Sequence, residues 1–73
     1  MTLTVELERE VDGRWIAEVL ELPGVLVYGA DRDEALRKVE AIALRVVADR
    51  LDHGEDIPGH ASGALSVSFS AAA

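Results

Sequence analysis

The chain has 73 residues and lacks cysteine altogether. Without cysteine it has neither a disulfide framework nor a thiolate metal site. Long apolar runs are also missing, and the N-terminus alternates apolar and polar residues, with early acids and no basic start. That pattern excludes a secretory signal peptide and a membrane span. We therefore expect a cytoplasmic protein that makes no contact with membranes.

Basic residues are scarce: seven Lys and Arg stand against fourteen Asp and Glu, which gives a formal net charge of −7. Nucleic-acid affinity depends largely on cations that neutralise phosphates, so we expect no direct binding of nucleic acid. An acidic surface instead attracts basic partners and steers their approach. Ordinary acidic proteins carry the same charge without a basic partner, and charge alone does not separate the two interpretations.

The chain is also short. A domain of this size buries only about 60% of its unfolded surface, and this one has no disulfide or metal cluster to compensate. Nevertheless 49% of its residues are apolar, more than so small a core can enclose. We expect residues 1–73 to form a single domain that associates into a homodimer or a higher homo-oligomer.

Four strands are predicted from local patterns. Apolar and polar residues alternate from Leu3 to Leu7, which is typical of a half-buried strand. Asp12-Gly13 predicts a type I′ hairpin turn, and a second strand is expected from Arg14 to Leu20. Pro23-Gly24 then predicts a type II turn.

A third strand follows over Val25–Tyr28 and ends at Gly29. Its near-continuous apolarity favours either a central strand or a strand whose outer face is covered by a partner. After a connecting loop from Glu55 to Gly63, a fourth strand is predicted over Ala64–Ser70, and the last three alanines are expected to fray.

One long helix is predicted between the third and fourth strands. Asp31 can accept the N–H of Glu34, and Glu34 can reach back to the N–H of Asp31, a capping-box arrangement that marks the first turn. His53 falls in the last turn and Gly54 follows it, which is an ordinary helix end. Apolar residues recur at helical spacing between these ends, at Ala35, Leu36, Val39, Ile42, Ala43, Val46, Val47 and Leu51.

The element order is βββαβ, and we expect an α+β fold in which one long helix packs on one face of a mostly antiparallel four-stranded sheet. If the alternating residues of the first and last strands face the helix, part of the remaining apolar set must lie elsewhere: Ile16, Leu20, Leu26 and Tyr28. Leu44 and Ala48 extend apolarity beyond the helix stripe, which predicts that the second half of the helix is covered on more than one side. A second copy or a different protein would cover such surfaces.

No residue set suited to catalysis is evident. Asp31, Asp33 and Glu34 form the densest carboxylate cluster; helix capping accounts for all three, and a divalent metal site is the alternative. His53 and His60 are separated by a loop and lack the further ligands that zinc requires. No nucleophile lies beside a base, and no glycine-rich loop is suited to phosphate. We therefore expect no enzymatic activity and no catalytic, cofactor-binding or metal-binding residues.

A series of short motifs runs through the middle of the chain. They are a hairpin of the D-G-x-aromatic type, L-P-G, a strand ending in glycine, an acid-E-A-L helix start, and a helix closing with G-x-x-I-P. Here these motifs are Asp12-Gly13, Leu22-Pro23-Gly24, Gly29, Asp33-Glu34-Ala35-Leu36 and Gly54-Glu55-Asp56-Ile57-Pro58. In this order, over about two-thirds of the chain, they resemble the HicB antitoxin family and are more specific together than singly.

The resemblance implies a domain likened to a partly degraded RNase H fold that lacks the metal-binding acids of that enzyme. Members of the family bind a small basic toxin, HicA, which degrades mRNA, and cover its active site. Many members also carry a C-terminal DNA-binding module, which has no counterpart after the predicted fourth strand, so autoregulation through this chain is left open. Val25 stands where the family often has cysteine, a small change because a buried thiol behaves as a small hydrophobe.

The resemblance implies a HicA-type toxin as the partner, but no short motif gives the contact residues. The need to meet a basic partner points to the acidic residues Glu6, Glu8 and Glu18, together with Tyr28 from the remaining apolar set. Two alternatives stay open. One is an orphan homo-oligomeric binding or regulatory domain without a toxin partner, and the other is a residual metal-dependent nuclease using Asp31 or Asp33.

Overall fold

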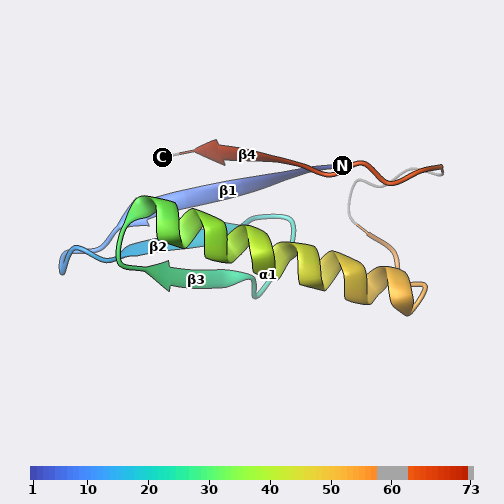
Figure 1. The fold of residues 1–73 in the computed structure, drawn as a ribbon, viewed down its shortest axis with the longest axis horizontal. Helices are drawn as coiled ribbons and strands as arrows, with labels where there is room; N and C mark the ends of the chain where they lie inside the picture. The colour runs from blue at the N-terminus through green and yellow to red at the C-terminus, as the bar shows by residue number, and fades with distance from the viewer. Residues whose placement is uncertain (58–62, 73) are drawn as a thin grey trace.

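The computed structural model describes residues 1–57 and 63–72. The described chain forms strands β1 (Thr2–Arg9), β2 (Trp15–Val19) and β3 (Leu26–Gly29), then helix α1 (Arg32–Asp52), and then strand β4 (Ser68–Ala72) (Figure 1). This order confirms the predicted βββαβ arrangement and the α+β class.

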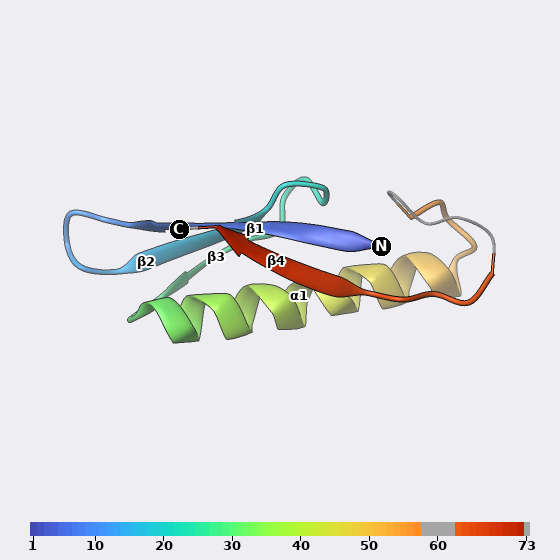
Figure 2. The same ribbon diagram turned by 90° about the horizontal axis from the view of Figure 1, so that it is seen from above.

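The strands form one mixed sheet in the order β3-β2-β1-β4. β2 pairs antiparallel with both β1 and β3, whereas β4 runs parallel to β1, so the mostly antiparallel sheet is confirmed. Helix α1 lies across one face of the sheet, and no other described element covers the opposite face (Figure 2). Because β3 is an edge strand, the first of the two alternatives predicted for it, a central strand, is wrong, and coverage of its outer face by a partner stays a prediction.

The core lies between α1 and the sheet. Alternate residues of β1 and β2 point toward the helix, which meets them with one small or β-branched residue per turn. The buried residues of these elements are Leu3, Val5, Leu7, Ala17, Val19, Ala35, Val39, Ala43 and Val47. Leu65, Val67 and Phe69 pack against the same core while keeping part of their surface exposed. The predicted helix-facing residues of the first and last strands are thus confirmed.

β3 approaches α1 closely at Gly29. A Cβ atom at this position would lie 2.4 Å from the backbone nitrogen of Ala35 and 2.8 Å from its Cα. Neither atom can move without displacing the first turn of the helix. The end of β3 therefore requires glycine because the helix backbone occupies the space of a side chain.

The connection between β1 and β2 is not the predicted type I′ turn. Gly13 has a φ of +92°, but Asp12 does not share the positive φ that a type I′ turn requires. The Gly13 N–H donates to the Glu10 carbonyl (3.0 Å), and the Glu10 N–H donates to the Arg14 carbonyl (2.7 Å). These bonds define a type I turn followed by a glycine bulge, in which only the third loop residue is left-handed.

The turn at Pro23-Gly24 agrees with the type II prediction. Gly24 has a φ of +90°, and the Val25 N–H donates to the Leu22 carbonyl at 3.1 Å. Proline and glycine occupy the two corners that the type II geometry assigns to them.

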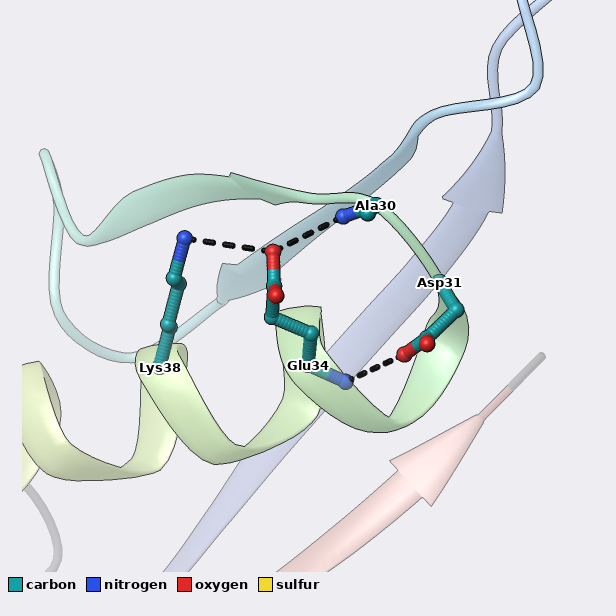
Figure 3. A network of polar contacts seen from close by, with 4 residues as sticks. All are labelled: Ala30, Asp31, Glu34 and Lys38. Carbon is teal, nitrogen blue, oxygen red and sulfur yellow. Dashed lines mark hydrogen bonds and ion pairs between the residues drawn. The ribbon is translucent and has the colours of Figure 1, made fainter.

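Helix α1 begins at the predicted cap, with one change in its partners. Asp31 has an extended φ of −140°, and its Oδ1 accepts the Glu34 N–H at 2.8 Å. Glu34 Oε1 accepts the N–H of Ala30 (2.9 Å), not that of Asp31 as predicted, and pairs with Lys38 Nζ at 3.3 Å (Figure 3). The Ala30 N–H, and after it Lys38, lower the pKa of the Glu34 carboxyl. The box therefore closes one residue earlier and ties the end of β3 to the helix.

The other end of α1 agrees with the prediction. His53 is the C-cap, and Gly54 follows it with a φ of +65°. The Gly54 N–H donates to the Leu51 carbonyl (3.2 Å), and the Glu55 N–H donates to the Arg50 carbonyl (2.8 Å). This pair of bonds is a Schellman motif, in which glycine takes the left-handed position.

Strand β4 begins later than the predicted strand over Ala64–Ser70 and includes two of the alanines that were expected to fray. Its register places Ser68 opposite Thr2 and Ala72 opposite Glu6. Because β1 begins at Thr2, the residues before Ser68 have no strand to pair with. The central part of the predicted loop, with Pro58, Gly59, His60 and Ser62, lies outside the described residues, as does Ala73.

A second apolar stripe lies on α1, on the side away from the sheet. Each residue turns the helix by about 100°, which places this set opposite the core-facing residues. We call it the outer stripe, and its members are Ala41, Leu44, Ala48 and Leu51. All are exposed, Leu44 by 47% and Leu51 by 48%. Within the described part of the single chain nothing covers this side of the helix, so its coverage by a partner stays a prediction.

Candidate functional site

No cleft or cavity is present among the described residues, so the candidate site is sought on the surface. The sheet face opposite α1 combines acidic and apolar side chains. We call it the open face, and its residues are Glu6 and Glu8 of β1, Ile16 and Glu18 of β2, Leu20 just beyond β2, and Leu26 and Tyr28 of β3.

The strand register brings the predicted partner-binding residues together. Glu6 lies directly opposite Glu18. Glu8 lies opposite Ile16, which in turn lies opposite Tyr28. Residues opposite one another on neighbouring strands project from the same side of the sheet. The three glutamates and the tyrosine therefore share the open face, although they come from three strands.

The open face is apolar toward β3. Leu20, Leu26 and Tyr28 expose 49%, 44% and 42% of their surface, respectively. Leu26 lies opposite Glu18, so the apolar strip borders the acidic band directly. These positions confirm that the apolar residues not needed by the helix-facing core lie elsewhere on the sheet.

The open-face glutamates take part in no ion pair within the described part of the chain. Glu21, just beyond β2, is in a different situation. Its carboxylate accepts the Thr4 N–H at 2.7 Å and the Thr4 hydroxyl at 2.8 Å. The Thr4 N–H is the main cause of a lowered pKa of Glu21, the hydroxyl adds to it, and burial opposes it. Glu21 is thus a structural carboxylate, whereas the open-face glutamates remain available to an external cation.

Arg14 borders the open face beside Tyr28. Its guanidinium carbon lies 4.6 Å from the centroid of the Tyr28 ring, a cation–π contact, and its Nε pairs with Asp12 Oδ2 at 2.8 Å. The backbone N–H of Arg14 also donates to Asp12 and is the main cause of a lowered pKa of that carboxyl. Sequence reasoning missed this contact, because it depends on the register of β2 against β3, in which Ile16, two residues after Arg14, lies opposite Tyr28.

The free edge of β3 adds backbone groups to the open face. The Val19 N–H donates to the Val25 carbonyl at 3.1 Å, and hydrogen-bonded pairs alternate along an antiparallel ladder. Leu26 and Tyr28 therefore direct their N–H and C=O groups away from β2. Within the described residues, no strand pairs with this edge.

The predicted carboxylate cluster at the start of α1 has a local explanation. Asp31 is the N-cap, and Asp33 and Glu34 lie in the first turn, where acidic residues are favoured by the helix dipole. The capping interpretation of these three residues is therefore sufficient.

A second group at the end of α1 was missed in the sequence. Candidate ligand atoms of Asp49, His53 and Glu55 all lie within 4.8 Å of one another. The spacing of four residues between Asp49 and His53 is the signal that would have found the first two. All three residues are exposed, and His53 Nδ1 already lies 2.7 Å from the Asp49 carbonyl oxygen. An imidazole at the carbonyl end of a helix has this interaction without any metal.

Within the described residues, no helix combines the length and the apolarity needed to cross a membrane. Comparison with models of protein families, with curated proteins and with solved structures gives no match for this chain. The function is therefore argued from the open face and the motifs of the sequence.

Proposed function

We propose that this chain is a HicB-like antitoxin-type protein that binds and neutralises a small basic mRNA-cleaving toxin of the HicA type. The observation that carries the proposal is the meeting of Glu6, Glu8 and Glu18 beside an exposed apolar strip on one face. The motif series and the formal net charge of −7 point the same way. In this proposal the domain is of the partly degraded RNase H type and works in the cytoplasm.

Neutralisation of such a toxin requires a surface and no chemistry by this chain. A protein that cleaves RNA holds phosphates with cationic side chains, and Glu6 and Glu18 offer carboxylates to the same cations. The apolar strip along β3 would exclude water around these pairs and contribute most of the affinity. The acidic band would mainly speed the encounter and fix its orientation. No cofactor, nucleic acid or membrane takes part.

The proposal is tested by RNA cleavage with a cognate HicA-type toxin at equimolar concentration. We expect the wild-type chain to suppress cleavage. The double variant Glu6→Gln/Glu18→Gln should inhibit less well, because it removes the paired charges but preserves side-chain size. Glu55→Gln makes the same change far from the open face and should inhibit like the wild type. Unimpaired cleavage at low salt with equimolar wild-type chain would contradict the proposal for that toxin.

The alternative is an orphan homo-oligomeric binding or regulatory domain without a toxin partner. The outer stripe of α1 favours it, since Leu44 and Leu51 are as exposed as the apolar residues of the open face. A chain that self-associates and leaves the toxin fully active would support this alternative.

A further inference from the structure

The outer stripe has the spacing of a helix-packing seam. Ala41, Leu44, Ala48 and Leu51 follow one another at intervals of three, four and three residues, the a and d pattern by which two helices pack along their length. The core-facing side of α1 is already occupied by the sheet. The helix therefore has a second seam that no residue among 1–57 and 63–72 covers, and a second molecule could pack on it.

We propose that the outer stripe packs antiparallel against the same stripe of a second copy and forms a two-fold symmetric dimer. A two-fold axis at the level of Val46 lies midway along the stripe. It sets Leu44 against Ala48 of the second copy and Ala41 against Leu51 of the second copy. Each large residue then faces a small one, so that the two helices can approach closely.

The charges beside the stripe are complementary in the same orientation. Arg37 and Lys38 are exposed near one end of the stripe, and Asp52 and Glu55 are exposed near the other. An antiparallel pair brings Lys38 beside Asp52 of the second copy, and Arg37 beside Glu55 of the second copy. A parallel pair would instead place Arg37, which lies on the line of the stripe, beside Arg37 of the second copy. The flanking charges thus select the antiparallel dimer.

The open face does not offer the same fit to a second copy. Two open faces together would oppose Glu6, Glu8 and Glu18 with the same residues, and like charges at an interface cost affinity. The outer stripe carries both signs, so it alone is self-complementary. Arg45 near the axis is its unfavourable element, because it would lie close to Arg45 of the second copy. The two exposed surfaces are therefore assigned to two different partners.

The size of the stripe sets the strength of the dimer. From Ala41 to Leu51 it is about 15 Å long at the rise of an α-helix. A helix contact of this length buries less surface than the roughly 800 Å² per partner of a standard stable interface. We therefore expect a weak dimer in rapid exchange with the monomer, present at high protein concentration.

Sedimentation velocity of the full chain over a concentration series tests the interface without any toxin. We expect the wild type to shift from monomer to dimer as concentration rises. Leu44→Glu should raise the dissociation constant by about tenfold or more, because each dimer loses two buried leucines. Leu20→Glu is the matched control: Leu20 is 49% exposed against 47% for Leu44, but lies on the open face. It should leave the dimer intact.

A charge exchange tests the antiparallel orientation. Arg37→Glu and Glu55→Arg should each weaken the dimer, and the double variant should restore it, because the pair is rebuilt with its signs reversed. Arg45→Gln should strengthen the dimer by removing the like charges near the axis. Circular dichroism of each variant confirms that α1 is retained.

Three results would overturn the proposal. The first is a wild-type chain that stays monomeric up to about millimolar concentration, where even a contact of about 4 kcal/mol would populate the dimer. The second is a dimer that Leu20→Glu dissociates and Leu44→Glu does not, which would place the interface on the open face. The third is a double charge exchange that fails to restore association, which would exclude the antiparallel arrangement. The first and third results leave the open face untouched, so this proposal can fail while the proposed function stands. The second result would place the dimer on the proposed toxin surface, and the RNA cleavage assay with the wild-type chain then decides separately whether a toxin is inhibited.

Discussion

Glu6 and Glu18 lie directly opposite one another on adjacent strands of the open face. Two acidic side chains in this position weaken the pairing of β1 with β2. The Glu6–Glu18 pair therefore does not stabilise the isolated chain, whereas a cationic partner could bind both carboxylates at once. Stability and partner binding should respond in opposite directions when one of the two charges is removed.

Glu18→Gln tests this opposition directly. We expect the free energy of unfolding of the isolated chain to rise by about 0.5 kcal/mol, because a repulsive cross-strand pair becomes neutral. Binding to a HicA-type toxin should weaken by up to about tenfold at low salt, with a smaller effect at high salt. Urea denaturation and titration calorimetry measure the two quantities. Glu55→Gln, away from the sheet, should change neither, and a loss of stability in Glu18→Gln would contradict the argument.

Gly29→Ala should be severely destabilising. The added methyl group would lie 2.4 Å from the backbone nitrogen of Ala35, so the first turn of α1 has to move away from β3. We expect a loss of about 3 kcal/mol or more, at the upper end of the range for overpacked cores. Denaturant unfolding measures the loss. Gly24→Ala is the contrasting variant, because it has a strained φ but free space around its Cβ position and should cost less.

Asp31→Ala removes the N-cap of α1. The Glu34 N–H loses its acceptor, and we expect the free energy of unfolding to fall by about 1 kcal/mol. Asp31→Asn keeps an acceptor oxygen at the same place and should retain most of the stability. Denaturation of both variants under identical conditions separates the hydrogen bond from the charge. Equal losses in the two variants would show that the charge and not the bond is what matters.

The Glu21–Thr4 contact predicts part of the acid sensitivity of the fold. The pKa of Glu21 is lowered in the folded chain from its ordinary value of 4.5, mainly by the Thr4 N–H. The folded state therefore binds this proton less tightly than the unfolded state. The stabilisation is complete above the unfolded pKa and is lost as the pH falls through the lower folded pKa.

Glu21→Gln should remove this pH dependence, because it keeps an acceptor for the Thr4 N–H but no longer titrates. We expect the free energy of unfolding to fall less between about pH 6 and about pH 3 in the variant than in the wild type. Thr4→Val removes only the hydroxyl donor, so its loss of unfolding free energy over this pH range should lie between those of Glu21→Gln and the wild type. Parallel acid profiles for Glu21→Gln and the wild type would rule this contact out as a source of acid sensitivity.

The sequence predicts the elements well where local chemistry decides them. Alternation from Leu3 to Leu7 fixes which face of β1 is buried, and Asp31 and Gly54 mark the two ends of α1. The predicted turn type of the first hairpin was wrong because Asp12-Gly13 is compatible both with a type I′ turn and with a type I turn followed by a glycine bulge. Only the pairing of the flanking strands selects the bulged turn. The start of β4 was mistaken for a similar reason. It depends on where β1 begins, which is information from the other end of the chain.

The candidate site could be predicted in part. Parity along each strand places Glu6 and Glu8 on one face of their strand, and separately places Glu18 on one face of its own. Only the pairing of β1 with β2 and of β2 with β3 shows that these faces are the same one and that Glu6 meets Glu18. The contact of Arg14 with Tyr28 depends on the same information, because the pairing of β2 with β3 makes the two residues diagonal neighbours.

The pairing of β4 with β1 joins the last of the four described strands to the first. Until Ser68 and the residues after it leave the ribosome, β1 has β2 on one side and an empty edge on the other. Parallel pairing between segments this far apart forms late, after the hairpins and the helix. During that interval the β4 of a neighbouring nascent chain can fill the edge of β1 with the same hydrogen bonds. An early meeting of β4 with the β1 of its own chain therefore favours a sheet completed within one chain, and a late meeting favours exchange of β4 between two chains.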